Sequence, residues 1–354
     1  MIAYRGLTAH LVTLAVAITV ALVVWTQKDA PRVAKGAEVE VWGGRPGDIT
    51  SIEFSADDRQ VKLVANKDAA GIWFEGTVEK TTRPPAPPPK PAPADAGSAD
   101  GGADAASVVP PPPPVAEPKQ ETIRFVGVKQ AQKLAESVAP LLALRALGKV
   151  EGARDEEFGF DKSEGTLKVS FGATTRTLVL GGTTPGGGDR YARLESGEAY
   201  AVPGSLAQNL LFAESRLVER DLFEFEAEDA IKVRVALGDK ARELVRLEEK
   251  KEGWADAATP TVQDETAGNW MSKLARLRIL NYDDKAQTSS PVAVVNVTYF
   301  AKGGRRLGEL GLFKAPGPDG KARFLARTSH TRWYAEVLSS AGEQIEQDLS
   351  SVLK

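Results

Sequence analysis

The sequence predicts an α+β fold: an N-terminal transmembrane helix followed by two duplicated modules of antiparallel strands with packed helices. Three observations predict it. The chain opens with a long apolar stretch, a pattern of strands that ends in a tryptophan occurs twice, and most strands follow one another directly. Strands in hairpins with helices set apart indicate antiparallel sheets and argue against a doubly wound parallel sheet.

The composition excludes several classes of protein. The 354 residues include no cysteine and two histidines, and 45 basic side chains nearly balance 48 acidic ones. A chain without cysteine has no disulfide scaffold, no cysteine-ligated zinc finger and no cysteine nucleophile. A net charge of −3 argues against nucleic-acid binding, which needs a basic surface. With 42% hydrophobic residues, the chain can bury a sizeable core.

The first predicted element is a membrane anchor over residues 1–27. Between Arg5 and Lys28 lie 22 residues without a formal charge. At ~1.5 Å per residue they make about 33 Å of helix, enough to cross a hydrocarbon core of about 30 Å. Residues 7–25 are longer than a signal-peptide core, and no small-x-small cleavage site follows them. We therefore expect an uncleaved signal anchor.

The charges around this helix bear on its orientation. Arg5 precedes it, whereas Lys28, Arg32 and Lys35 follow it. The positive-inside rule disfavours export of such a cluster, but the rule loses force for a long translocated domain. We expect a single-pass protein of the bacterial inner membrane, its bulk extracytoplasmic, with residues 28–47 as a juxtamembrane segment.

The second element is a strand pattern that occurs twice. Alternating segments begin at Asp48 and at Asp229, and each continues through a turn and a second strand. A tryptophan follows 25 positions after each start, at Trp73 and at Trp254. We expect these two indoles to fill the cores of the two modules.

The similarity continues beyond the tryptophans. Residues 141–147 resemble residues 274–280 at a constant offset of 133, and we expect both stretches to end helices. At an offset of 134, the pairs Arg193 and Tyr200 match Arg327 and Tyr334. Later strands are predicted at 166–171, 177–180, 191–194 and 199–202, and at 292–300, 307–313, 322–327 and 331–337. Helices capped by Ser205 and carrying Ile345, Leu349 and Val352 close the modules.

A proline-rich insert interrupts the first module. The offset between modules is 181 before the tryptophans and 133 after them, a difference of 48 residues. Residues 81–119 hold 13 of the 22 prolines and can account for it. Proline lacks a backbone donor, so we expect a solvated, disordered spacer. It is either a tolerated loop or a ligand for a proline-binding groove. The first module then comprises residues 48–80 and 120–216, and the second residues 217–354.

Candidate sites for chemistry are few. The glycine-rich loop 181–189 lacks the lysine and helix of a phosphate-binding loop, and we expect a hairpin connection. Ser329 and His330 point to opposite faces of a predicted strand, so they do not form a nucleophile–base pair. The acidic runs 155–157 and 219–229 lack EF-hand spacing and are expected to be solvated. Arg193 and Arg327 either bind an anion in each module or are sheet positions shared by duplication. We therefore assign no catalytic, cofactor-binding or metal-binding residues.

The motifs resemble the bacterial domain-of-unknown-function family 4340 over residues 48–282, outside the insert. The residues that carry the resemblance are Asp48, Ile49, Ile52 and Phe54, then Gly71-Ile72-Trp73, Leu178-Val179-Leu180-Gly181, Tyr191-Ala192-Arg193, Tyr200-Ala201-Val202 and Arg220-Asp221-Leu222-Phe223. The resemblance implies a membrane-anchored accessory of an ABC-type transport complex, with a permease or a gliding-motility-type auxiliary subunit as partner. It supplies no catalytic residues.

These observations favour a non-enzymatic extracytoplasmic interaction protein. One alternative is a membrane-tethered module that binds a ligand or glycan, which requires a concave pocket with convergent polar groups. Another is a hydrolase that uses carboxylates alone, which requires two acidic groups roughly 5–10 Å apart in a cleft.

Overall fold

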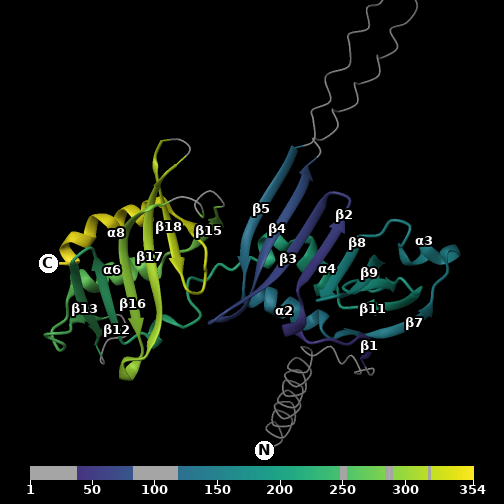
Figure 1. The fold of residues 1–354 in the computed structure, drawn as a ribbon, viewed down its shortest axis with the longest axis horizontal. Coiled ribbons are helices and arrows are strands. Elements are labelled where there is room, and N and C mark those ends of the chain that lie inside the picture. The colour runs from purple at the N-terminus through teal and green to yellow at the C-terminus, as the bar shows by residue number, and fades with distance from the viewer. Residues whose placement is uncertain (1–37, 83–118, 248–252, 284–286, 288–289, 318–319) are drawn as a thin grey trace, which may run out of the picture.

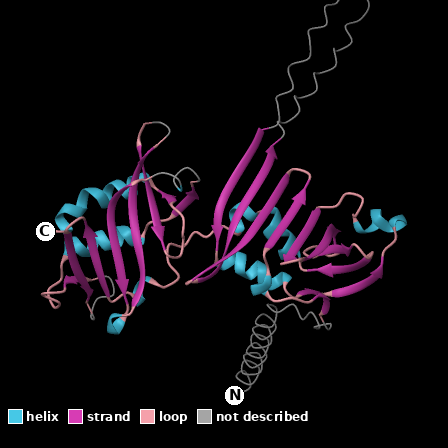
Figure 2. Ribbon diagram, in the orientation of Figure 1, coloured by secondary structure: helices cyan, strands magenta, loops and turns pink. Residues whose placement is uncertain are grey.

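The computed structural model describes residues 38–82, 119–247, 253–283, 287, 290–317 and 320–354. They form two antiparallel sheets, each with helices on one face, so the α+β class is confirmed (Figures 1 and 2). The predicted anchor and most of the predicted insert lie outside the described residues. Within the described part of the chain, no helix combines the length and apolar character that a bilayer crossing needs.

The first sheet has nine strands in the order β5-β4-β3-β2-β8-β9-β10-β11-β7. A separate ribbon pairs β1 with β6. The strands are β1 Val39–Trp42, β2 Ser51–Ala56, β3 Arg59–Asp68, β4 Gly71–Thr82, β5 Lys119–Gly127, β6 Leu141–Ala143, β7 Arg145–Lys149, β8 Gly165–Phe171, β9 Thr174–Thr183, β10 Arg190–Leu194 and β11 Glu198–Val202. The helices are α2 Lys129–Val138, α3 Asp155–Phe158, α4 Gly204–Leu211 and α5 Ala213–Arg216.

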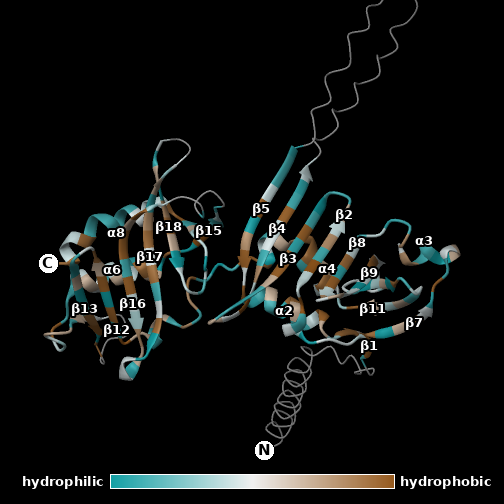
Figure 3. Ribbon diagram, in the orientation of Figure 1, coloured by the Kyte–Doolittle hydropathy of each residue, from teal (hydrophilic) through white to brown (hydrophobic). Residues whose placement is uncertain are grey.

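The second sheet has eight strands in the order β14-β13-β12-β16-β17-β18-β19-β15. They are β12 Lys232–Leu237, β13 Lys240–Arg246, β14 Trp254–Asp256, β15 Ile279–Tyr282, β16 Val292–Phe300, β17 Arg306–Pro316, β18 Ala322–Thr328 and β19 Ala335–Val337. Helices α6 Glu265–Ala275 and α8 Ser339–Val352 pack on one face, where Trp270 of α6 donates a hydrogen bond to the Ile345 carbonyl at 3.0 Å. Hydrophobic and hydrophilic residues alternate along these strands (Figure 3), as expected where one sheet face is buried.

The two sheets share one strand order. Reading from β4 in the first and from β14 in the second, every strand has a counterpart at the same place. Helix α2 corresponds to α6 in chain order, and α4 to α8. Strand β5 is the exception, because β14 leads to α6 without a strand in that place. The first sheet therefore carries one strand more than the second.

The extra strand forms a long hairpin with β4. Their pairing runs from Phe74 opposite Gly127 out to Thr82 opposite Lys119. In Figure 1 this hairpin projects beyond its neighbours, with the end of β4 and the start of β5 at its tip. The proline-rich segment accounts for only part of the 48-residue offset, because β5 and the outer half of β4 supply the rest.

The predicted helix end at residues 141–147 is wrong. Helix α2 ends at Val138, and the leucine-rich stretch forms β6 and β7. Pro140 has no backbone N–H and cannot continue a helix, so the chain becomes extended there. Residues 274–280 are likewise split, because α6 ends at Ala275 and β15 begins at Ile279.

Two boundary predictions near the module ends also need correction. The strand expected at 331–337 contains only Ala335–Val337, because residues 329–331 form a turn. The helix expected after Ser205 begins one residue earlier, at Gly204, without a side-chain cap, and it breaks at Phe212. Its predicted core positions are nevertheless buried: Leu206, Leu210, Ala213 and Leu217.

The two tryptophans occupy different surroundings. Trp254 is buried in the core of the second module, as expected. Trp73 is only half-buried, and its ring meets the edge of Trp333 at a centroid distance of 6.5 Å. Trp73 therefore packs at the contact between modules and not within one core.

Candidate functional site

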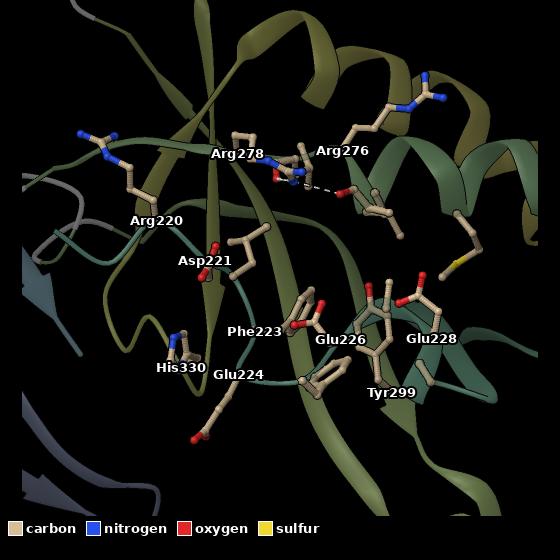
Figure 4. Close-up of a pocket in the computed structure, with 18 of the residues that line it drawn as sticks. Arg220, Asp221, Phe223, Glu224, Glu226, Glu228, Arg276, Arg278, Tyr299 and His330 are labelled. Carbon is tan, nitrogen blue, oxygen red and sulfur yellow. Dashed lines mark hydrogen bonds between the residues drawn. The ribbon is translucent and has the colours of Figure 1, made fainter. Parts of the chain in front are cut away.

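A cleft of about 720 Å³ opens where the two modules meet. We call residues 217–231, which join α5 to β12, the linker. The linker forms one wall of the cleft, the C-terminal end of α6 forms another, and the N-terminal end of α2 and Tyr299 of β16 complete it (Figure 4). Cavities of this size at module boundaries are common binding sites.

The motif Arg220-Asp221-Leu222-Phe223 lies in this linker and fastens it to the second module. Arg220 donates to the carbonyl oxygens of Ile279 and Leu280, the outer edge of β15, at 3.4 and 3.1 Å. The Leu222 carbonyl accepts a hydrogen bond from the Thr328 hydroxyl at 2.7 Å. Arg220 and Leu222 therefore hold the linker against the second module.

Glu219 is a buried carboxylate that ties both modules to the linker. Its oxygens accept hydrogen bonds from the backbone N–H of Lys129 at 3.1 Å and of Asp221 at 3.0 Å. His330 Nε2 lies 3.4 Å from the same carboxylate. Burial alone would raise the pKa of Glu219, but these donors outweigh it, and the pKa lies below its ordinary value. Its own carbonyl accepts a bond from the buried Tyr282 hydroxyl at 2.9 Å.

A second set of contacts fixes the junction beside Glu219. Arg332 of the second module bonds both carboxylate oxygens of Asp68, at 2.8 and 3.2 Å, and lies over the Trp73 ring. Arg124 of β5 lies over the Trp333 ring at 5.2 Å. The Arg332 guanidinium holds the pKa of Asp68 below its ordinary value. Paired charges and stacked rings thus hold the modules in one arrangement around the cleft.

The floor of the cleft is aromatic. Phe223 and Phe225 lie 4.7 Å apart, and both pack on Tyr299, at 4.8 and 5.6 Å between ring centroids. Tyr299 is 7% exposed, and its hydroxyl has no hydrogen-bond partner among the described residues. Figure 4 shows this hydroxyl directed into the cavity. Burial raises the pKa of Tyr299, so the hydroxyl stays protonated at physiological pH.

The rim of the cleft carries charges of both signs. Glu224, Glu226 and Glu228 line it from the linker, and none has an ion pair within the described chain. Arg278 bonds the carbonyls of Ala275 and Leu277 at the end of α6. Arg276 points away from the cavity in Figure 4. Arg246 also lines the cleft and donates to the linker carbonyls of Ala227 and Ala230, at 2.6 and 2.9 Å.

The residues singled out in the sequence lie in several places. Of the predicted loop 181–189, residues 181–183 belong to β9 and residues 184–189 connect β9 to β10; Gly188 packs on Gly204 at the start of α4. Asp155 is paired with Arg193, and Glu157 with Arg154. His330 lines the cleft but lies in a turn, bound to Glu219 and not beside a hydroxyl nucleophile. No group of three or more His, Asp or Glu able to hold a metal occurs in the described ranges.

Arg193 and Arg327 occupy comparable positions in the two sheets, but Tyr200 and Tyr334, which were expected to match, do not. Arg193 pairs across the strands with Ala199, and it lies over the Phe160 ring at 4.4 Å. Ala326 pairs with Ala335, which brings Arg327 opposite Tyr334, over whose ring it lies at 5.2 Å. The second hairpin is one residue longer, and a shift of one residue turns a side chain to the other face. Tyr200 therefore faces the core, opposite Ala192.

Sequence reasoning missed the residues that form the cleft floor. Phe223 belongs to a motif noted above, but Phe225 and Tyr299 belong to none. Glu219 is 5% exposed, but it stands in a run of acidic residues, and such a run predicts a solvated surface. Nothing in the sequence therefore indicated that this carboxylate is buried. The alternation of phenylalanine and glutamate at 223–226 was the available signal for one apolar face.

Comparison with known proteins gives one family. A family model described as Domain of unknown function (DUF4340) matches residues 130–294. The resemblance to DUF4340 is confirmed over this range. The match begins within α2, so it leaves β1 to β5 unmatched, and it ends in β16. The whole linker, α6 and the start of β16 lie within the matched range, whereas Tyr299 lies just beyond it. No curated protein and no solved structure matches the chain.

Proposed function

We propose that this chain is a non-enzymatic, membrane-anchored extracytoplasmic protein whose two duplicated modules bind a partner protein at the junction cleft. The partner belongs to an ABC-type transport complex, as a permease or a gliding-motility-type auxiliary subunit. The observation that carries the proposal is the cleft itself: a fixed aromatic hollow at the module junction, walled by DUF4340 sequence. The common strand order supports duplication.

The anchor follows from residues 7–25, whose apolar length suits a bilayer. It would tether the modules next to an integral membrane complex. Arg220 and Arg278 at the cleft bind backbone carbonyls, which suits recognition better than acid–base chemistry.

Co-purification tests this proposal. The full chain, tagged at its C-terminus, is extracted in mild detergent and its partners are identified by mass spectrometry. We expect a permease or auxiliary subunit, and its loss from a Phe223→Ala variant. Phe212→Ala, which truncates a phenylalanine 49% exposed, is the control and should retain the partner. Repeated recovery of the wild-type chain alone would refute the transport assignment.

A second candidate function is binding of a small ligand or glycan near the membrane. The volume of the cleft, about 720 Å³, and the free Tyr299 hydroxyl favour it. A glycan array probed with the purified full chain tests this function. Binding that survives Phe223→Ala would place the glycan elsewhere and remove this candidate from the cleft.

A further inference from the structure

The first module covers part of its sheet with a segment of its own chain. We call the side of each sheet that faces away from its core helices the outer face. Residues 150–164 join β7 to β8, and within them α3 lies against β9 (Figure 1). Phe158 meets the Tyr191 ring edge-on at 4.8 Å between centroids. Its carbonyl oxygen lies so near to Gly181 that a Cβ added there would be 2.5 Å away. The segment therefore packs directly on the strands.

This segment also supplies the ionic partner of Arg193. The two Nη groups of Arg193 donate to the two carboxylate oxygens of Asp155, and the guanidinium lies over the Phe160 ring at 4.4 Å. A bidentate pair of this kind fixes both the charge and the orientation of an arginine. The segment thus presents one carboxylate and aromatic rings to the outer face.

The equivalent arginine of the second module has no such partner. A shorter segment, residues 283–291, joins β15 to β16. Arg327 is exposed, donates from Nε to the Arg332 carbonyl at 2.9 Å and lies over the Tyr334 ring. Within the described residues it forms no ion pair, and its Nη groups have no acceptor. A guanidinium with unused donors is therefore left on this outer face.

An open groove of about 670 Å³ lies beside Arg327. Gly311 pairs across the strands with Arg327 on one side and with Asn296 on the other, so the three residues form one row. Val295 and Val297, the neighbours of Asn296, are buried in the core, and successive side chains of a strand point to opposite faces. The row therefore lies on the outer face of the second sheet.

The floor of the groove is aromatic, and its wall carries a spare amide. The Phe313 ring leans over Gly311, because a Cβ added to that glycine would lie 2.5 Å from Phe313 Cε2. Phe313 also meets the Tyr334 ring at 5.1 Å. Asn296 is half-buried, and its side-chain amide has no hydrogen-bond partner in the described part of the chain. A ring, an amide and a guanidinium thus line one groove.

The charges that line the groove leave one positive group unbalanced. Arg306 is paired with Glu309, and Arg332 is paired with Asp68. The remaining charged residue of the lining is Arg327. A negatively charged group is therefore the complementary ligand.

We propose that this groove binds a segment of a partner protein that places a carboxylate on Arg327 and an aromatic side chain on Phe313. The first module supplies the template, since Asp155 and Phe158 present these two groups at the equivalent place. Phe313 stands where the first module has Gly181, two residues beyond the position opposite the arginine, so the second module already contributes one ring. This inference goes beyond the proposed function, because the groove and the cleft floor lie on opposite faces of the second sheet.

The test uses the full chain in mild detergent and three pools of fluorescent, acetylated decapeptides. The first pool has aspartate and, three positions later, phenylalanine, which is the spacing of Asp155 and Phe158. The second pool has asparagine for the aspartate, and the third has serine for the phenylalanine. The other positions are random but exclude acidic and aromatic residues. Binding is measured by fluorescence anisotropy. Benzoylphenylalanine in place of the phenylalanine gives photo-cross-links, which mass spectrometry locates.

We expect saturable binding of the first pool and about tenfold weaker binding of the other two, with cross-links on β17 or β18. Arg327→Gln should weaken binding of the first pool about tenfold and should remove the preference for aspartate over asparagine. The control is Arg234→Gln, which removes the same charge from an exposed arginine of the same outer face that does not line the groove. This control should leave binding unchanged.

Several results would overturn the inference. Among them are no binding of the first pool, equal binding of the asparagine pool, an aspartate preference that survives Arg327→Gln, and cross-links confined to the junction cleft. A glucuronate polymer that binds through Arg327 while the peptides do not would assign the groove to an acidic saccharide instead. Failure to co-purify a transport subunit would refute the proposed partner of the cleft and leave peptide binding at Arg327 in place.

Discussion

The buried carboxylate of Glu219 offers a direct test of how the junction is held. It is 5% exposed and faces three donors: the N–H groups of Lys129 and Asp221 at 3.1 and 3.0 Å, and His330 Nε2 at 3.4 Å. Glu219→Gln keeps the shape and one acceptor oxygen but turns an amide NH₂ toward a donor. The variant loses one charge-assisted hydrogen bond and leaves the N–H donor of that bond without an acceptor. This loss should lower the free energy of unfolding by about 2 kcal/mol.

The pH dependence of this loss has a definite sign. The folded-state pKa of Glu219 lies below its ordinary value, because its donors outweigh the cost of burial. A carboxyl whose pKa is lowered by folding adds stability above its unfolded pKa of about 4.3, and that stability is lost as the pH falls through the folded value. The difference in unfolding free energy between wild type and E219Q should therefore be largest at pH 7 and should decrease below about pH 4.

Urea denaturation followed by tryptophan fluorescence measures both effects. The control is Glu53→Gln, whose side chain is 41% exposed and pairs with Lys62 at the surface. It should change the unfolding free energy by less than about 0.5 kcal/mol. A change below 0.5 kcal/mol in E219Q, or a gap that widens on acidification, would refute the reasoning.

Three further predictions concern the frame around the cleft. Gly76→Ala should lower the free energy of unfolding, measured in urea, by about 1–3 kcal/mol, because the added Cβ would lie 2.3 Å from the Phe125 ring. The control is Gly152→Ala, whose added Cβ would have no atom within 4 Å and which should leave the free energy of unfolding unchanged. A double-mutant cycle of Asp68→Asn and Arg332→Gln should give a coupling of about 1 kcal/mol, and additive effects would mean that the pair does not hold the junction. Replacing residues 83–118 by a four-residue turn should raise the midpoint of thermal unfolding, because shortening the loop about ninefold recovers roughly 2 kcal/mol of closure entropy. An unchanged or lower midpoint would show that the segment contacts the folded modules.

Local patterns in the sequence predicted most strands of the second sheet and failed where a single proline interrupts a helical pattern. The predicted strand at 292–300 has the observed bounds, because β-branched and aromatic residues predominate throughout it. The stretch 141–147 was predicted as helix because its leucines and alanines favour helices, but Pro140 before it forbids the continuation.

The sequence predicted the candidate site less well than it predicted the fold. Glu219 lies in a run of charged residues, and only the approach of Lys129 and His330 makes it a buried acceptor. Tyr299 and Phe223 are 76 positions apart, and each is ordinary for the element that carries it. A cleft between modules depends on how those modules dock, which hydrophobic periodicity within a module does not encode.

Some differences between the two units gather at their junction. The shared features, such as the strand order and the arginines stacked at Arg193 and Arg327, maintain each sheet. Features found in only one unit lie at the junction: β5 contacts β15, and the end of α6 lines the cleft beside the linker. In the first unit Pro140 follows α2, and β6 then pairs with β1. In the second unit α6 continues to Ala275, so no second ribbon of this kind forms within the described residues.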